Sequence, residues 1–237
     1  VHGVTYPGDV WSFTTQGYQV VDDFERYTDK SGEEVWSVWL DGFDNPATNG
    51  AMVGWATAVN GTYCETTLIH GDKRSMPLAY DNSKAPVSEA VRTFDSPQDW
   101  TANEIKSLSL WFLGAAGNTG QLYAKINGAK VLYAGAATDL ARAAWHVWNI
   151  DLSQAGQVNR VRTLTIGIEG SGAQGTLYFD DIRLYSSLPE PITPADPGTL
   201  GLVAHYKFDG DAKDAAGSHH GTLSGAPQPF TAGKVGQ

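Results

Sequence analysis

Short runs of alternating apolar and polar residues, separated by Gly, Asn, Asp and Pro, fill the chain from Tyr18 to Tyr185. Such alternation is typical of strands with one buried face. It predicts strands near residues 19–24, 35–40, 66–69, 75–80, 89–94, 105–113, 121–126, 130–133, 145–152, 163–168 and 176–185. The only helical windows, 138–144 and 153–158, are short enough to be loop turns. Many short strands at even spacing predict an all-β fold, an antiparallel β-sandwich.

The same alternation divides three of these strands into a core side and an outer side. The apolar sets expected in the core are Leu108, Leu110 and Phe112; Leu122, Ala124 and Ile126; and Trp148, Ile150 and Leu152. If the three strands are neighbours, one outer sheet face gathers Trp111, Tyr123, Lys125, Asn149 and Asp151. Rings beside hydrogen-bonding groups make a candidate binding surface. The alternative is that a loop or a flanking module covers the rings.

Two apolar runs near the ends of this span carry adjacent carboxylates: Val20–Glu25 and Thr176–Tyr185. On a regular strand Asp180 shares a face with Ile182 and Leu184, so that its carboxylate points where apolar side chains point. An unpaired buried carboxylate is costly. We therefore expect Asp180 to lie at the sheet margin, to pair with an Arg or Lys, or to bind a cation. An ordinary edge acid or a salt bridge is as good a reading of the sequence as a metal ligand.

The region from Tyr27 to Gly61 is long for a connection and is rich in large aromatic residues. Long ordered loops in compact domains are often functional. We expect Trp36 or Trp39 to anchor the loop in the core, and Trp55 and Tyr63 to remain as candidate walls of a binding cleft.

Proline and glycine mark the boundaries of the expected domains. Residues 1–17 contain one strand, 8–15, which is either the last strand of a preceding immunoglobulin-like or fibronectin-like module or an added edge strand. The main β domain spans 18–187. Four prolines between 188 and 200 predict a semi-rigid linker. Residues 201–237 begin a new segment that is too short for a core of its own.

Composition and charge exclude several classes of partner. The 237 residues include 26 acidic and 16 basic side chains, a net charge of −10, with no cluster of Lys or Arg. Nucleic acid and membrane are therefore not expected as partners. Cys64 is alone, so there is no disulfide framework and a buried thiol is expected. Eight Trp and ten Tyr are more than packing alone usually needs, and indicate either a large core or a contact surface.

Four motifs carry a resemblance to a known family. They are Asp22-Asp23-Phe24-Glu25, Ile105–Phe112, Trp145–Leu152 and Phe179-Asp180-Asp181-Ile182. The span 20–185 resembles carbohydrate-binding modules of the galactose-binding-like jelly-roll type, close to family 11 and to families 4 and 22. The tail from Gly201 resembles the first strands of a laminin-G-like lectin domain, cut off early.

The resemblance implies a structural calcium ion. In such modules early acidic residues, a late Asp and backbone carbonyls of a loop hold the ion. Transferred to this sequence, these are Asp23, Glu25 and Asp180, with carbonyls from 71–75, Lys73 among them. Oxygen ligands of this kind suit Ca²⁺.

Catalysis is the rival class of function. The acidic residues of the two end runs could form a glycosidase pair, which needs two carboxyl groups across a cleft. No nucleophile elbow, zinc-binding helix or phosphate loop accompanies them. The sequence therefore predicts a non-enzyme.

The prediction is a polysaccharide-binding jelly-roll module, monomeric within a secreted multimodular bacterial protein, extracellular or on the cell surface. Trp111 and Tyr123 would stack on sugar rings, while Lys125, Asn149 and Asp151 would bond hydroxyl groups. The alternative is a structural or adhesion spacer of a bacterial surface protein that binds no sugar. The particular glycan depends on loop shape.

Overall fold

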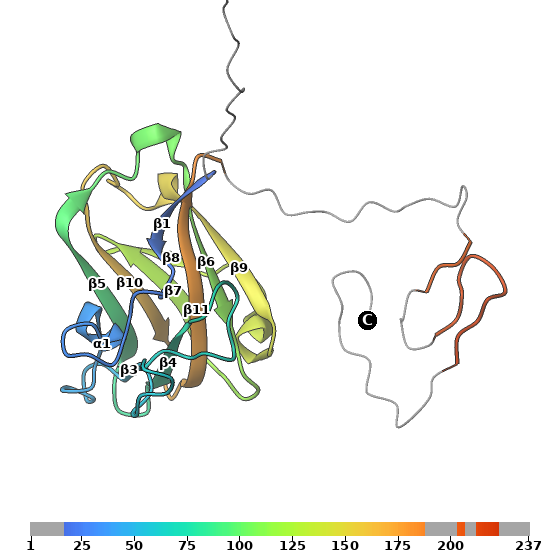
Figure 1. Cartoon of the computed structure of the whole chain (residues 1–237), viewed down its shortest axis with the longest axis horizontal. Coiled ribbons are helices and arrows are strands. Elements are labelled where there is room, and N and C mark those ends of the chain that lie inside the picture. Colours follow the sequence, from blue (N-terminus) through green and yellow to red (C-terminus); the bar gives the residue numbers. More distant parts are fainter. Residues whose placement is uncertain (1–16, 188–202, 207–211, 223–237) are drawn as a thin grey trace, which may run out of the picture. The chain divides into compact units, whose positions relative to one another are not determined.

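The structure, a computed structural model, describes residues 17–187, 203–206 and 212–222. The chain divides into two compact units, Val1–Pro189 and Glu190–Gln237. The first unit contains a sandwich of two β-sheets (Figure 1). In the second, Tyr206 and Asp214 form an isolated antiparallel bridge. The strand expected at 8–15, the linker and most of the tail lie outside the described residues.

The two sheets are antiparallel throughout the part of the chain that the structure describes. The first sheet has the order β3-β4-β11-β6-β9, and β1 also pairs with β11. Its strands are β1 (Tyr18–Asp22), β3 (Ala51–Val53), β4 (Met76–Asp81), β6 (Ser107–Leu113), β9 (Trp145–Asp151) and β11 (Gln174–Tyr185). The second sheet has the order β2-β5-β10-β7-β8. Its strands are β2 (Trp39–Leu40), β5 (Val87–Gln98), β7 (Gln121–Ile126), β8 (Ala129–Leu132) and β10 (Val161–Glu169).

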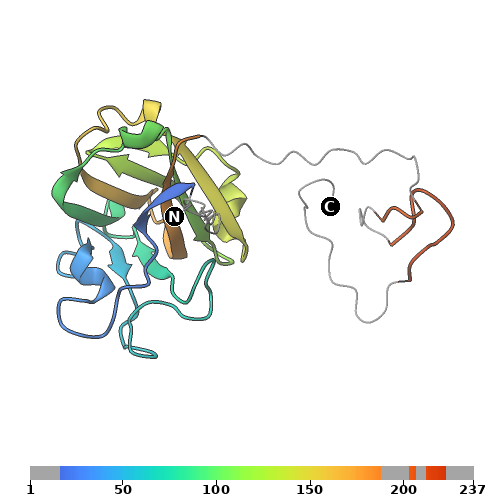
Figure 2. The same cartoon turned by 45° about the horizontal axis from the view of Figure 1, so that its top comes forward.

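The helical elements are one short α-helix, α1 (Val35–Val38), and three 3₁₀ turns within the described residues. The turns are η1 (Ala102–Glu104), η2 (Ala137–Ala141) and η3 (Leu152–Gln154). The all-β class and the antiparallel jelly-roll sandwich predicted from the sequence are confirmed. Figure 2 shows the sheets as two layers when the sandwich is turned toward the viewer.

The core lies between the two sheets and follows the alternation of the sequence. The nine residues expected inside from β6, β7 and β9 with the start of η3 are all buried. Full burial of a large aliphatic or aromatic side chain contributes about 1.5–3 kcal/mol. A tight hairpin joins β7 and β8, because Asn127 (φ 49°) and Gly128 (φ 87°) adopt the left-handed backbone of its two-residue turn. Cys64 is a buried free thiol, as expected.

Two local predictions were wrong, and one short strand was missed. Residues 35–40 form α1 and the short β2 instead of one strand, although Trp39 is fully buried and anchors the loop as expected. Residues 66–69 form no strand, because the carboxylate of Glu65 accepts the amide N–H groups of Thr66, Thr67 and Leu68. Those amides are therefore not free to pair with a neighbouring strand. The short β3 was not predicted.

A β-bulge in β11 corrects the predicted orientation of Asp180. The register of β11 against β6 shifts between Asp180 and Arg183, and Asp181 has a positive φ of 49°. The extra residue moves Ile182 and Leu184 into the core while Asp180 stays on the outer face, opposite Trp111. Asp180 and Ile182 thus lie on opposite faces of the sheet, although they are two residues apart.

A buried carboxylate joins β1 of the first sheet to the second sheet. Asp22 is only 3% exposed, and its Oδ2 accepts hydrogen bonds from Tyr27 Oη (2.6 Å) and Trp39 Nε1 (2.9 Å). The same oxygen pairs with the guanidinium of Arg92, which also donates to the carbonyl of Val21. We call these four side chains the Asp22 hub. The hub ties β1 to β2 and β5 across one edge of the sandwich.

Candidate functional site

The structure does not bring the five predicted outer-face residues together. Strands β6 and β9 are neighbours in the first sheet, whereas β7 lies in the second. Trp111, Asn149 and Asp151 therefore lie on the outer face of the first sheet, and Tyr123 and Lys125 on that of the second. The prediction of one shared surface was wrong because the strand order in space differs from the order in the sequence.

Four aromatic side chains gather at one end of the outer face of the first sheet. Tyr178, Leu113 and Trp145 lie opposite one another in a row across β11, β6 and β9, and Trp111 lies two residues before Leu113 on β6. Trp55 contacts Tyr178 with a centroid distance of 6.1 Å. We call Trp55, Trp111, Trp145 and Tyr178 the ring platform. All four are only partly buried, so core packing does not account for them.

A loop crosses this platform. The segment from Glu65 to Ser75, whose ends form an antiparallel bridge, is called the strap. The imidazole of His70 stacks on Trp111 with a centroid distance of 3.8 Å and an interplanar angle of 19°. Its edge also meets Trp145 at 5.7 Å. The sequence left open the alternative that a loop covers the rings. The strap does cover one face of Trp111.

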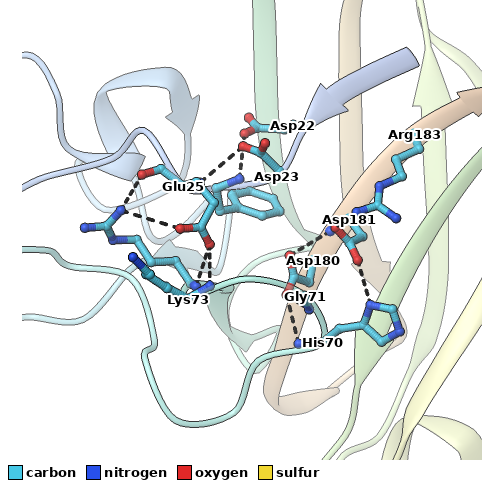
Figure 3. A network of polar contacts seen from close by, with 11 residues as sticks. Asp22, Asp23, Glu25, His70, Gly71, Lys73, Asp180, Asp181 and Arg183 are labelled. Atoms are coloured by element: carbon cyan, nitrogen blue, oxygen red, sulfur yellow. Dashed lines mark hydrogen bonds and ion pairs between the residues drawn. The ribbon is translucent and has the colours of Figure 1, made fainter. Parts of the chain in front are cut away.

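The carboxylates of β11 hold the tip of the strap (Figure 3). Asp180 Oδ2 accepts the backbone N–H groups of His70 (2.9 Å) and Gly71 (3.1 Å). Asp181 Oδ2 lies 2.7 Å from His70 Nδ1, and its Oδ1 accepts from Arg183 Nη2 at 2.5 Å. Burial raises the pKa of Asp180 to about 7, although the two strap amides oppose the shift.

Glu25 holds the other side of the strap, as Figure 3 also shows. Its Oε1 accepts the backbone N–H groups of Lys73 (2.8 Å) and Arg74 (2.7 Å). The Arg74 guanidinium bonds the carbonyl of Glu25 and lies 3.7 Å from its Oε2. Among the described residues, no hydrogen bond or ion pair joins Asp23 to the strap. Its Oδ1 accepts the N–H of Glu25 at 3.2 Å.

The carboxylates predicted to hold calcium, those of Asp23, Glu25 and Asp180, all accept backbone N–H groups in this arrangement. Lys73 presents its N–H, not its carbonyl, to Glu25, and Asp180 is likewise bonded to N–H donors. No group of three or more His, Cys, Asp or Glu side chains within the described ranges could hold a metal ion. A structural calcium at Asp23, Glu25 and Asp180 therefore stays a prediction from the sequence.

A polar row lies beside the platform on the same sheet face. Arg183, Ser109 and Asn149 are opposite one another across β11, β6 and β9. Asn149 Oδ1 is buried without a hydrogen-bond donor in the described part of the chain. Asp151 follows on β9, and the N–H of Ser153 lowers the pKa of its carboxyl group. Two of the three predicted hydroxyl-bonding residues thus lie on the sheet that carries Trp111.

Tyr123 occupies a different environment on the outer face of the second sheet. Its ring crosses Gly167 of β10, and its hydroxyl donates to Glu89 Oε1 of β5 at 2.5 Å. Lys125 Nζ reaches the same carboxylate oxygen at 2.5 Å. Lys130 Nζ lies 4.2 Å from the ring centroid of Tyr123 and also pairs with Glu169. The ring is fully buried, so a sugar could stack on it only after these side chains moved.

The close approach of Tyr123 to Gly167 gives a test of this packing. A Cβ at position 167 would lie 2.5 Å from Tyr123 Cζ. We expect Gly167→Ala to lower the free energy of unfolding by about 1–3 kcal/mol, because the ring would have to move. Urea unfolding measures the change. A Tyr123→Ala background should remove most of it, and an equal loss in both backgrounds would contradict the contact.

Comparisons with known proteins find fold neighbours only. No family model matches the chain, and no curated protein matches it. Among solved structures, the family 11 carbohydrate-binding module of a cellulosomal cellulase of Clostridium thermocellum is 14% identical. The match covers 75% of this chain and 99% of that one, with a TM-score of 0.43. A family 30 module of another cellulosomal cellulase of the same organism is 13% identical over 61% and 96% of the two chains, with a TM-score of 0.38.

A third match is an exo-β-agarase that is 14% identical. The matched region covers 80% of this chain and 29% of the agarase chain, with a TM-score of 0.42. Some of the matched structures are thus carbohydrate-binding modules of the kind that the sequence resembles. Identities and TM-scores this low carry no inference about ligand or activity. The sandwich itself is seen directly in the sheet topology of this chain.

Sequence reasoning missed three residues of this region, Trp145, Tyr178 and His70. Alternation could have found Trp145, which lies on the same side of β9 as Asn149, and Tyr178, which lies two residues before Asp180. His70 has no such signal because it lies in a loop.

Within the described residues, no helix is both long and apolar enough to cross a membrane.

Proposed function

We propose that the sandwich is a non-catalytic glycan-binding module of a secreted multimodular protein, and that the ring platform is its binding surface. The observation that carries the proposal is the clustering of Trp55, Trp111, Trp145 and Tyr178 on an outer sheet face, partly exposed and away from the core. Flat rings stack on the apolar faces of pyranosides, which gain contact area at little cost in side-chain entropy.

The polar row beside the platform supports the same ligand class. Sugar hydroxyl groups both donate and accept hydrogen bonds. Asp151 is a pure acceptor, and Asn149 Oδ1 has no donor among the described residues. Ser109, which can donate and accept, lies between Asn149 and Arg183 and is only 3% exposed. A ligand that stacks on Trp111 and extends toward β9 would meet apolar contact and hydrogen-bonding groups together, which is the combination that sugar recognition requires.

Removing one ring of the platform tests the proposal. We expect Trp111→Ala to weaken binding to a retained polysaccharide about tenfold or more, which corresponds to about 1.4 kcal/mol of lost contact. Affinity electrophoresis against soluble β-glucan, xylan, mannan and agarose measures the retardation. Phe43→Ala is the matched control, since Phe43 is 73% exposed and lies on a different loop from the platform residues.

The strap supplies a second variant for the same measurement. His70→Ala uncovers the face of Trp111 that the imidazole now occupies. The variant should bind at least as tightly as the unaltered protein if sugars stack on that face. Retardation by none of the polysaccharides would favour the alternative, a spacer or adhesion module without sugar binding. Release of reducing ends from the same panel would identify an enzyme.

A further inference from the structure

A groove of about 620 Å³ runs along β5, away from the ring platform. Three parts of the chain line it: Arg26 after β1, the end of α1 with β2, and the second half of β5. The lining residues in β5 are Arg92, Thr93, Phe94, Asp95, Ser96, Pro97 and Gln98. Its volume lies in the range of sites that hold small molecules or short oligomers, about 300–1,000 Å³.

The groove follows a free edge of the second sheet. β2 pairs only with Val91 and Arg92 of β5, so the rest of β5 beyond Arg92 has no strand on that side within the described residues. The other side of β5 pairs with β10. In Figure 1, the upper part of β5 lies at the outer edge of the sheet, and α1 lies beside its lower part. Backbone N–H and C=O groups are therefore open to the groove.

Several features of this edge disfavour the pairing of another strand with it. The register of β5 against β10 shifts between Thr93 and Gln98, and Pro97 in this stretch has no N–H to donate. A charged residue, Asp95, also lies on it and is exposed. Bulges, prolines and charges are the features by which edge strands avoid pairing with other chains. An extended peptide is thus a poor occupant.

Three polar side chains of the groove have no hydrogen-bond partner among the described residues, whereas Arg26, Ser37, Arg92 and Gln98 each have one or more. Thr93, Asp95 and Ser96 are exposed and make no side-chain hydrogen bond in the part of the chain that the structure describes. Gln98 uses Oε1 to accept from Trp100 Nε1 (3.0 Å), which leaves its amide N–H groups unused. The groove thus offers free hydroxyl groups, a carboxylate acceptor and an amide donor within six residues.

The Asp22 hub holds one further donor rigidly at this groove. Arg92 is 11% exposed in its side chain and uses Nη1 for both of its hydrogen bonds, to Asp22 and to the carbonyl of Val21. Its Nε and Nη2 bond no described residue. Because Asp22 also fixes Trp39 and Tyr27, the guanidinium is held in place before any ligand arrives.

We propose that the groove along β5 is a second binding site, for neutral hydroxyl-rich oligosaccharides, separate from the ring platform. Donors (Arg92, Gln98), an acceptor (Asp95) and hydroxyl groups suit neighbouring sugar hydroxyls, while Val38 and Leu40 offer apolar contact. A neutral ligand fits because Asp22 already offsets the charge of Arg92, and Arg26 and Asp95 carry opposite charges. The inference takes its ligand class from the proposed function but rests on different residues.

The test is an NMR titration of the full 237-residue chain. Cellohexaose, xylohexaose and mannohexaose serve as neutral probes and hexagalacturonate as the acidic one. Amide shifts are followed on β6, on β9 and at residues 93–98, apart from Pro97, which has no amide N–H. For the neutral probe that shifts 93–98, Asp95→Asn should raise the Kd at these amides about tenfold. Thr93→Val with Ser96→Ala should do likewise. The control Asp44→Asn removes an exposed carboxylate outside the groove and should leave the Kd unchanged.

Trp111→Ala separates the two sites. Shifts at 93–98 that persist in Trp111→Ala but weaken in Asp95→Asn support the groove as a binding site. This holds even if no shifts appear on β6 and β9, a result that would contradict the function proposed for the ring platform. Shifts confined to β6 and β9 leave the platform standing and overturn the groove. No shift at 93–98 with any neutral probe, or tighter binding of hexagalacturonate there, also overturns the proposal. Unchanged melting temperatures of the exposed-site variants confirm that each is folded.

Discussion

Replacing Asp22 with alanine should lower the free energy of unfolding by about 3–5 kcal/mol, a large part of the total stability of a domain of this size. The change removes the acceptor of Tyr27 and Trp39 and leaves the guanidinium of Arg92 mostly buried without its counter-charge. Urea unfolding followed by tryptophan fluorescence measures the loss.

The neighbouring carboxylate provides the control. Asp23 is half-buried and makes one local hydrogen bond, to the N–H of Glu25. Asp23→Ala should therefore change the free energy of unfolding by no more than about 0.5–1 kcal/mol. Similar losses in the two variants would show that the Asp22 hub does not hold β1 to the second sheet.

In the presence of a metal chelator, the free energy of unfolding should decrease as the pH rises from about 4 to about 7, because the pKa of Asp180 differs between the folded and unfolded states. Its pKa is about 7 in the folded protein, against an ordinary value of 3.8. The unfolded chain thus loses this proton near pH 4, while the folded chain keeps it until near pH 7. Between these values the folded state binds more protons, so raising the pH favours unfolding.

The size of this effect is up to about 4 kcal/mol, at about 1.4 kcal/mol for each pH unit of the shift. Asp180→Asn cannot ionise and should flatten the decline. Urea unfolding at pH 4, 5.5 and 7 in EDTA measures both slopes. A wild-type slope that matches that of Asp180→Asn would contradict the raised pKa.

Repeating the series with calcium tests the predicted metal. An ion held by ionised Asp180, Glu25 and Asp23 would stabilise the folded state by mass action and reverse the decline toward pH 7. The gain should vanish in Asp180→Asn. If calcium changes neither the slope nor the melting temperature, the calcium prediction is wrong, and the N–H groups of the strap are the lasting partners of Asp180 and Glu25.

Alternation along the chain was enough to predict the core of the fold. Leu108, Leu110 and Phe112 are all buried because alternate side chains of a regular strand point to the same face of the sheet. The same counting failed at Asp180, because one extra residue at Asp181 reverses the faces of everything after it. A bulge stabilised by contacts with a distant loop leaves little local signal.

The candidate site was predicted only in part, for a different reason. Trp111 and Asn149 share a surface because β6 and β9 pair, whereas Tyr123 lies on another sheet. Strand neighbours depend on long-range packing, which the spacing of residues within a strand does not encode. The covering of Trp111 by His70 depends likewise on contacts between positions about 110 residues apart, such as Asp180 with the His70 amide.

The pairing of β1 with the end of β11 has a consequence for the architecture of any longer protein. Tyr18 and Tyr185 are direct cross-strand partners, and such partners have Cα atoms roughly 5 Å apart. The polypeptide thus leaves the sandwich beside the point where it came in. The segments before and after the domain are therefore attached close together, and the domain adds little to the distance between them. This geometry suits a module that presents a surface and is a poor design for a rod that holds other domains apart.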